Sequence, residues 1–226
     1  VYLTDVEGLR LLPHTGETVT LRSVSKRIVG KGENVIARKG KGRDKRIVVT
    51  AHIDAKKGTH GAIDNATGVI ILLLLARLLE DYKGDRQIEI VALNGEDYYA
   101  APGQMRYLNK NREHLQEIQF NINIDGAGYR EGRSAFSFYE FPQELKKKAD
   151  EVIQKFIGII EGPQWYQGDH SIFIQNGRPA IAVSSEWFTR YIDSQEITHT
   201  PKDQPGIVDC QKVVEIAEAI NLLLRN

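Results

Sequence analysis

Histidine and acidic residues recur along this chain in short motifs whose side chains could bind a metal ion or transfer a proton. His52 and Asp54 form a His-x-Asp motif. In an extended segment alternate side chains share a face, so the ring and the carboxylate can be neighbours. A carboxylate bonded to the far nitrogen of a metal-bound imidazole fixes its tautomer and strengthens it as a ligand. A second motif, Gly-Ala-Ile-Asp-Asn-Ala-Thr-Gly over 61–68, places Asp64 before a very apolar segment, where it could also cap a helix.

Three more motifs contain the same residue types. Glu96 and Asp97 are adjacent acids, and two neighbouring carboxylates are costly to pack unless a positive charge lies between them. Asp125 precedes a glycine, and His199 lies in a Thr-His-Thr-Pro loop. Each residue taken alone is typical of a turn, a helix cap or a solvated loop.

Taken together, these residues favour a site that holds positive ions. Carboxylates that converge without a cation repel one another. Two histidines with several carboxylates suit zinc better than calcium or magnesium, which favour all-oxygen sites. In two-metal hydrolases the ions lie roughly 3.5–4 Å apart around the reacting oxygens, and an acid that is not a ligand carries the proton. The candidates are His52, Asp64, Glu96, Asp97, Asp125 and His199.

The elements that must position these residues are predicted by hydrophobic periodicity. Short β-branched and apolar runs predict strands over 34–38, 46–51, 87–93, 120–124, 134–138 and 180–184, with a looser alternation over 19–29. Longer apolar or amphipathic segments predict helices over 65–82, 104–115, 142–158 and 209–224. We therefore expect an α/β fold, with a mostly parallel mixed β-sheet sandwiched between helices. Loops at the carboxyl ends of its strands would then hold the candidates on one rim.

Composition excludes several other classes of protein. The chain has 226 residues, 41% hydrophobic and 27% charged, which suits one large core. Lys plus Arg equals Asp plus Glu at 30 each, so no basic field attracts nucleic acid or anionic lipid. The longest apolar run, 69–76, is far shorter than the roughly 20 residues of a membrane span. The single cysteine, Cys210, excludes an internal disulfide and a cysteine-based zinc site.

The order of the motifs resembles the M28 family of zinc aminopeptidases. The family pattern is a His-x-Asp, a Gly-Ala-x-Asp-Asn-Ala-(Ser/Thr)-Gly, an acidic pair after a strand, an Asp after the next strand and a late His-Thr. This chain has those motifs at 51–54, 61–68, 94–97, 123–126 and 198–201. The similarity extends from about residue 34 to the end and implies the zinc-exopeptidase fold. The motif over 61–68 is the most specific of the five.

The resemblance implies two zinc ions and removal of N-terminal residues from peptides by a water that both ions activate. Asp64 would bridge the ions, His52 and Asp125 would complete one site, and Asp97 and His199 the other. The family commonly has Glu at the position of Asp97. Because Asp is one methylene shorter, its loop must lie closer to the metal.

The same resemblance assigns the catalytic roles. Glu96 would be the general base that takes a proton from the bridging water and passes it to the leaving amine, and Asp54 would orient His52. The family often has a cis peptide bond after the bridging acid, here between Asp64 and Asn65. A later stretch, 165–173, is similar to a family segment near the substrate. Its Tyr166 or His170 could donate a hydrogen bond to the developing oxyanion, or simply form the pocket wall.

The resemblance also bears on organisation and location. Residues 1–29 resemble the tail of a protease-associated domain that some relatives insert before the catalytic part, here 30–226. The chain begins at Val1 without a methionine or a signal-like segment, so we expect a processed or truncated product. A secreted or extracytoplasmic location is expected from the family alone. The expected partner is a peptide substrate, without nucleic acid or a membrane span, and the oligomeric state is open.

Other functions compatible with the motifs are a glutaminyl cyclase, a carboxypeptidase and a non-catalytic binding domain. Cyclases bind one zinc ion and do not normally have the Asp-Asn-Ala-Thr-Gly motif. A carboxypeptidase needs a basic group for the substrate carboxylate, for which Arg106, Arg130 and Arg190 are candidates. Non-catalytic relatives normally lack several ligands, whereas every ligand position here is filled. The specificity for the removed residue and the native metal are open.

Overall fold

The computed structural model describes the whole chain except residues 1–4, 25, 27–28, 99–101, 195 and 226. It divides into two compact units, Val1–Lys31 and Gly32–Asn226. The first contains helix α1 (Asp5–Leu11) and the 3₁₀ turn η1 (Leu12–His14). The strand predicted over 19–29 is wrong for the described part of that range, which has no regular structure. Val19 and Val24 are 73% and 87% exposed, so their alternation has no core to face. The protease-associated interpretation of 1–29 stays a prediction.

The second unit is built on a seven-stranded sheet with the order β1-β3-β2-β4-β7-β5-β6. Strand β1 pairs antiparallel with β3, and β5 pairs antiparallel with β7, while the other four pairs are parallel. This confirms the mostly parallel mixed sheet. The strands are β1 (Val35–Lys39), β2 (Gly42–His52), β3 (Arg86–Leu93), β4 (Ile118–Ile124), β5 (Ser134–Tyr139), β6 (Ile159–Glu161) and β7 (Ala180–Ser185).

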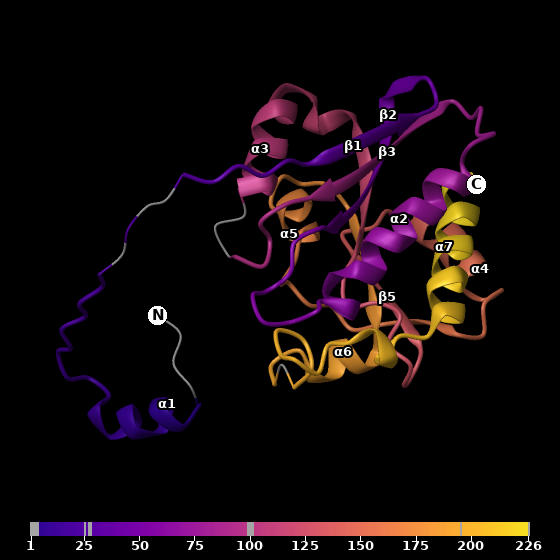
Figure 1. The fold of residues 1–226 in the computed structure, drawn as a ribbon. Coiled ribbons are helices and arrows are strands. Elements are labelled where there is room, and N and C mark those ends of the chain that lie inside the picture. Colours follow the sequence, from indigo (N-terminus) through magenta and orange to yellow (C-terminus); the bar gives the residue numbers. More distant parts are fainter. Residues whose placement is uncertain (1–4, 25, 27–28, 99–101, 195, 226) are drawn as a thin grey trace. The chain divides into compact units, whose positions relative to one another are not determined.

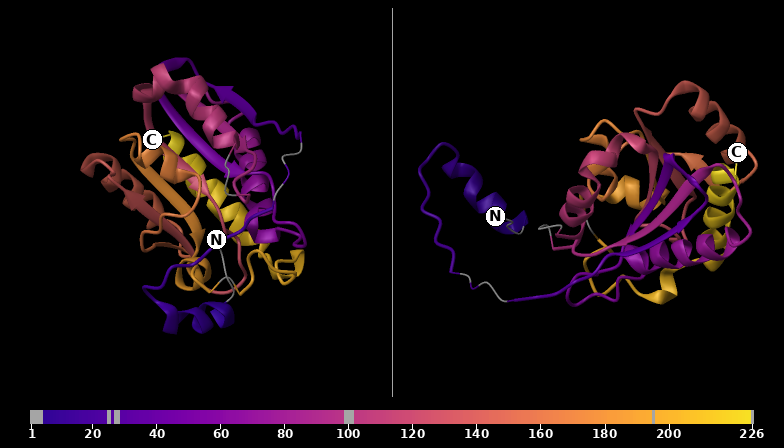
Figure 2. Two further views of the ribbon diagram at one scale, coloured as in Figure 1. Left: turned by 90° about the vertical axis from the view of Figure 1, so that its left-hand side faces the viewer. Right: turned by 90° about the horizontal axis from the view of Figure 1, so that it is seen from above.

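Helices cover both faces of the sheet (Figures 1 and 2). Helices α2 (Thr67–Leu78), α4 (Gln143–Ile153) and α7 (Cys210–Arg225) pack on one face, and α3 (Pro102–Asn111) and α5 (His170–Ile174) on the other. Alternation along β2 supplies both cores. Ile47 and Val49 belong to the first core, whereas Val48 belongs to the second. Helix α6 (Glu186–Tyr191) follows β7 and packs through Phe188 on a third, smaller cluster.

The connections place a crevice at the end of β2. The chain leaves β2 through α2 to reach β3 on one side, then passes through α3 to β4 on the other side. In open α/β sheets ligands bind where the strand order reverses in this way, beyond the carboxyl ends of the strands. His52 is the last residue of β2, and Asp125 directly follows β4. The topology therefore brings these two residues to the crevice.

Two helices differ from the predicted ranges because the backbone adopts another conformation at one end. The helix predicted over 65–82 begins at Thr67, because Asp64 and Asn65 have non-helical backbone angles in the preceding turn. The helix predicted over 104–115 ends at Asn111 and continues as the 3₁₀ turn η3 (Arg112–Glu117). β6, α5 and α6 were not predicted, since three to six residues are too few for a clear period.

No helix in the described part of the chain is long and apolar enough to cross a membrane. Cys210 is a free, exposed thiol at the start of α7.

Burial along α2 predicts a large difference between two leucine positions that lie two residues apart. Leu75 is fully buried, whereas Leu73 is 66% exposed on the same helix. Leu75→Ala should lower the free energy of unfolding by about 2–5 kcal/mol, through lost transfer energy and the cavity that remains. Leu73→Ala should change it by about 0.5 kcal/mol or less. Urea unfolding followed by circular dichroism measures both; similar losses in the two variants would contradict the packing of α2.

Candidate metal centre

The carboxylate of Asp64 lies between two imidazole rings. The π-helical turn η2 (Ala62–Ala66) presents this residue directly before α2. Asp64 Oδ1 lies 3.1 Å from His52 Nε2, and Asp64 Oδ2 lies 3.1 Å from His199 Nε2. The peptide bond between Asp64 and Asn65 is cis, which confirms the prediction for this bond. Asp64 is therefore placed to contact two cations at once.

Two further acids complete a group of ligand atoms around each imidazole. Asp125 Oδ1 lies 3.5 Å from His52 Nε2, and Asp97 Oδ1 lies 2.8 Å from His199 Nε2. Ligand atoms of His52, Asp64 and Asp125 lie within 4.8 Å of one another, and the same holds for Asp64, Asp97 and His199. The structure thus brings the five predicted ligands together as two groups that share Asp64.

The buried carboxylates favour the protonated, positively charged form of the two imidazoles. Hydrogen bonds to Asp64 and Asp97 raise the pKa of His199 to about 10. Burial lowers the pKa of His52, but the carboxylates of Asp125 and Asp64 outweigh burial and hold it well above its usual value. A metal ion binds the neutral imidazole and displaces these protons. The negative charge of the carboxylates therefore favours a bound cation.

The donor set and its burial fit zinc. Asp97 is 1% exposed, and its Oδ2 accepts no hydrogen bond from any residue that the structure describes. A buried carboxylate oxygen without a donor is costly unless a cation satisfies it. His52 Nε2 has Asp64, Asp125 and Glu96 oxygens at 3.1, 3.5 and 3.9 Å, more negative charge than one ring can neutralise. Two imidazoles with carboxylates are ligands that zinc prefers.

Glu96 lies beside the two groups but belongs to neither. Its Oε2 is 3.9 Å from His52 Nε2, and the side chain lines a pocket of about 110 Å³ together with Asp64, Asp97, Asp125 and His199. Burial and the nearby Asp125 carboxylate raise the pKa of Glu96 to about 8. A bound cation opposes the part of this shift that comes from negative neighbours. Glu96 is thus the acid of the cluster that is placed to carry a proton.

Asp54 contacts His52 through a different atom from the predicted one. The backbone carbonyl oxygen of Asp54 lies 3.0 Å from His52 Nδ1, whereas its carboxylate Oδ1 lies 3.8 Å away. The carboxylate instead accepts hydrogen bonds from the backbone N–H groups of Gly95, Glu96 and Asp97, at 2.7, 3.2 and 3.2 Å. These three bonds draw the acidic loop towards β2, which gives the shorter acid Asp97 its reach to His199.

Asp203 holds the loop of Asp64 by backbone N–H groups, as Asp54 holds the loop of Asp97. The sequence motifs did not predict this role. Its Oδ1 accepts a hydrogen bond from the N–H of Ile63 at 2.8 Å, and its Oδ2 accepts one from the N–H of Asp64 at 3.2 Å. The side chain is fully buried. Asp203 follows His199 by four residues in one loop, so it ties that histidine to the shared carboxylate. An acid at this spacing after a ligand histidine was the available signal.

The backbone of His199 adds a constraint of its own. Its φ is 62°, in the left-handed region that residues other than glycine rarely adopt. Such conformations persist where the surroundings hold them and are frequent at functional sites. The contacts around His199 therefore hold its backbone in an uncommon conformation, which sets the position of the imidazole.

Neither of the two predicted substrate-contact residues lines the pocket. Tyr166 is 63% exposed, and its hydroxyl donates a hydrogen bond to Gln164. His170 is fully buried, its Nε2 lies 2.8 Å from the Trp165 carbonyl oxygen, and burial lowers its pKa to about 4. The oxyanion role of either residue stays a prediction. Besides the acids and His199, the pocket is lined by Trp165, Gly168, Phe188 and Ile192.

Comparison with known proteins yields one family. A sequence model described as peptidase family M28 matches residues 34–224. Among curated proteins, the aminopeptidase YwaD of Bacillus subtilis is 30% identical over 83 residues, which are 36% of this chain and 18% of that protein.

Solved structures share the fold. An aminopeptidase from Aneurinibacillus sp. strain AM-1 superposes with a TM-score of 0.72 at 20% identity, over 84% of this chain and 47% of its own. BSAP, a zinc aminopeptidase from Bacillus subtilis, gives a TM-score of 0.72 at 21% identity, over 84% and 49%. The predicted α/β fold of the zinc-exopeptidase type is confirmed. The chain spans about half the length of these two proteins.

The contacts of Asp203 predict a loss of metal affinity when its charge is removed. In Asp203→Asn the side-chain amide replaces one of the two accepting oxygens, so the Asp64 loop loses an anchor. We expect zinc affinity to fall about 10–100-fold, the usual effect of altering a group that holds a ligand in place. Competition with a chelating dye measures this. Asp193→Asn, at an exposed position, is the matched control; unchanged affinity in Asp203→Asn would contradict the anchoring role.

Proposed function

This chain belongs to peptidase family M28, and from that premise we propose that it is a zinc-dependent aminopeptidase acting on peptides. The observation that carries the proposal is the shared carboxylate of Asp64, with one oxygen 3.1 Å from each of two imidazoles. Each imidazole has its own second acid, so the residues form two adjoining cation sites. Two adjoining sites are what hydrolysis by a metal pair requires.

Five residues would hold the metal: His52 and Asp125 on one side, Asp97 and His199 on the other, and Asp64 between them. Zinc bound there supplies a Lewis acid that lowers the pKa of a water and stabilises negative charge on the substrate oxygen. Asp54 and Asp203 keep the ligand loops in place through backbone amides.

Glu96 is the proposed general base. It takes a proton from the attacking water as the oxygen bonds to the scissile carbonyl carbon. It returns that proton to the amine nitrogen as the carbon–nitrogen bond breaks, so the carboxylate ends as it began. The position of Glu96 supports this role, since it lines the same pocket as the ligands without being one of them.

The charge of the pocket favours the amino end of a peptide. Asp64, Glu96, Asp97 and Asp125 line it, and no arginine or lysine does so among the described residues. The arginines considered for a carboxypeptidase lie elsewhere. Arg190 is 3.4 Å from Glu186, Arg130 is 4.0 Å from Glu131, and Arg106 lines a different groove. The pocket therefore offers no basic side chain to a substrate carboxylate among the described residues, whereas Glu96, the lining acid that is not a proposed ligand, can accept a hydrogen bond from a substrate ammonium.

The same contacts give less support to a glutaminyl cyclase or a non-catalytic binding domain. A glutaminyl cyclase uses one zinc ion, whereas the five proposed ligands here form two groups that share Asp64. A binding domain that had lost its metals would not be expected to keep the complete ligand set with Glu96 beside it. The extracytoplasmic location expected from the family stays a prediction.

Replacing the proposed base should separate catalysis from metal binding. After zinc loading, Glu96→Gln should keep two zinc ions per chain and lose about 10²–10⁴-fold in kcat on aminoacyl-nitroanilides, because Gln cannot accept the proton. Metal content by atomic emission and initial rates measure the two effects. Glu113→Gln, at an exposed position, should behave as wild type. Equal rates in wild type and Glu96→Gln would refute the role of Glu96, and a zinc-loaded wild type that cleaves nothing would favour the binding domain.

The pocket wall predicts which N-terminal residues are removed. Trp165, Phe188 and Ile192 form an apolar wall in a cavity of about 110 Å³. Leucyl- and methionyl-nitroanilides should therefore be cleaved with kcat/KM about tenfold or more above the aspartyl and lysyl substrates, whose charges lose hydration there. N-acetyl-leucyl-nitroanilide should not be cleaved, because it lacks the ammonium group. Cleavage of the blocked substrate, or release of C-terminal residues from a peptide, would contradict an aminopeptidase.

A further inference from the structure

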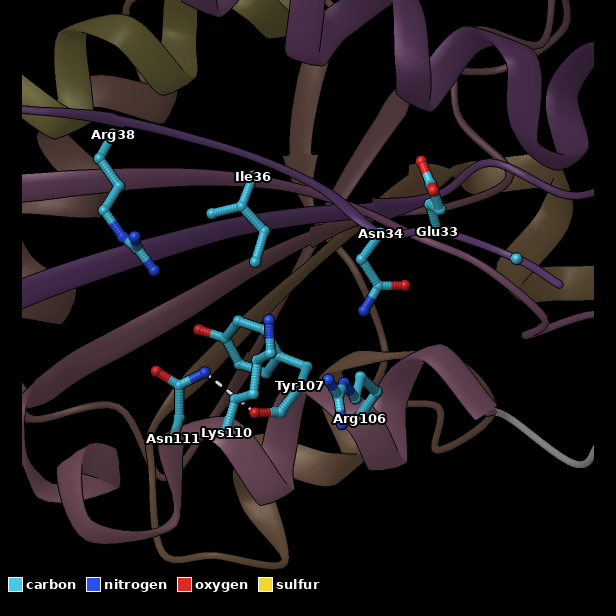
Figure 3. Close-up of a pocket in the computed structure, with 9 residues that line it drawn as sticks. Glu33, Asn34, Ile36, Arg38, Arg106, Tyr107, Lys110 and Asn111 are labelled. Atoms are coloured by element: carbon cyan, nitrogen blue, oxygen red, sulfur yellow. Dashed lines mark hydrogen bonds between the residues drawn. The ribbon is translucent and has the colours of Figure 1, made fainter.

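A second, larger cavity lies outside the metal centre, between the edge strand β1 and helix α3 (Figure 3). Its volume is about 770 Å³, and we call it the β1–α3 groove. Residues of β1 and of the segment before it form one wall, and residues of α3 form the other. The side chains that matter below are Asn34, Ile36, Arg38, Arg106, Tyr107 and Lys110.

One wall of the groove is an open sheet edge. Strand β1 is the first strand in the sheet order and pairs only with β3 among the described strands. The outer edge of such a strand presents unpaired N–H and C=O groups, to which an extended segment can bind as a further strand. Ile36 and Arg38 alternate along β1 and point towards α3 (Figure 3). A segment added to this edge would therefore lie along the groove.

The two walls run in the same direction. At one end the side-chain amide of Asn34 donates a hydrogen bond to the carbonyl oxygen of Gly103, at the start of α3. Further along, Arg38 and Tyr107 meet on the same carboxylate, that of Glu89, at 2.5 and 2.6 Å. Glu89 is fully buried and lies on β3 beneath the groove. Hydrogen bonds at two points along the groove thus hold β1 and α3 in place relative to each other.

The helix wall carries surplus positive charge. Arg106 and Lys110 are exposed and one helical turn apart, and neither has an ion-pair partner among the described residues. Like charges at this spacing repel each other. The helix dipole accounts for Lys110 in the last turn, but not for Arg106 in the middle. The charge of Arg38 at the strand wall is balanced by Glu89, so Arg106 and Lys110 face a single lining acid, Glu33.

We propose that the β1–α3 groove binds an extended acidic peptide segment, which pairs with the edge of β1 and places acidic side chains on Arg106 and Lys110. The spacing supports this partner. Alternate side chains of an extended peptide are about 6.6–6.8 Å apart. Residues four apart on a helix are separated by about 6 Å along its axis. Two acids at alternate positions therefore match the two cations, while the apolar side chain of Ile36 contacts the peptide between them.

Binding is tested with the zinc-loaded full chain and the peptide Glu-Val-Glu-Val-Glu, N-acetylated and amidated. The blocked end makes the peptide no substrate for an aminopeptidase, so the result is independent of the proposed function. Fluorescence anisotropy with an uncharged dye should show saturable binding. The neutral peptide Gln-Val-Gln-Val-Gln and the variant Arg106→Glu/Lys110→Glu should each bind about tenfold more weakly or worse. Lys147→Glu, an exposed lysine on α4, is the charge control and should bind as wild type.

A second measurement separates strand pairing from surface attraction. Hydrogen exchange of the Val35–Lys39 amides should slow when the acidic peptide is bound. The proposal is overturned by an absence of saturable binding, by an equal loss of affinity in Lys147→Glu, or by binding that leaves exchange of β1 unchanged. A dimer of the free protein that the double variant abolishes would assign the groove to a second copy of this chain, which also overturns it.

Discussion

The metal centre depends on aspartate side chains that hold other acidic loops by their backbone amides. Asp54 accepts hydrogen bonds from the N–H groups of residues 95–97, and Asp203 accepts them from residues 63 and 64. An amide donor compensates a buried carboxylate, which would otherwise be expensive to place beside further acids. The hydrogen bonds of Asp54 and Asp203 therefore have two effects. They compensate part of the negative charge of these aspartates, and they set the position of a ligand residue.

This arrangement divides the work between the sheet and the loops. The sheet supplies rigid anchor points, since His52 ends β2 and Asp125 follows β4. The loops supply the other residues of the two candidate ligand groups, Asp64, Asp97 and His199, whose positions the hydrogen bonds to Asp54 and Asp203 help to set. Apolar packing on both faces of the sheet fixes the register of the strands. Strand register thus sets the positions of His52 and Asp125, and amide hydrogen bonds set those of the loop residues.

Much of the rim was predictable because its residues directly follow apolar β-branched runs, whose carboxyl ends meet in a parallel sheet. His52 and Asp125 are found there for that reason. Asp203 was not predictable by periodicity, because its role depends on how two loops far apart in the sequence meet. The orientation of Tyr166, whose hydroxyl bonds to Gln164, was not predictable because a motif places a residue in a segment but does not say which way its side chain points. The exposed 19–24 region shows the same limit, since alternation without a partner surface makes no strand.

The hydrogen bond between Ile63 and Asp203 joins residues 140 positions apart. Closing so long a loop costs conformational entropy, which only the assembled core can offset. The ligand constellation therefore depends on the assembled native core, which brings the two loops together. A cation that binds the native state but not the unfolded one shifts the folding equilibrium towards the native state. Retained zinc would then report on the integrity of the whole domain, and scarcity of zinc would act on the abundance of the protein as well as on its chemistry.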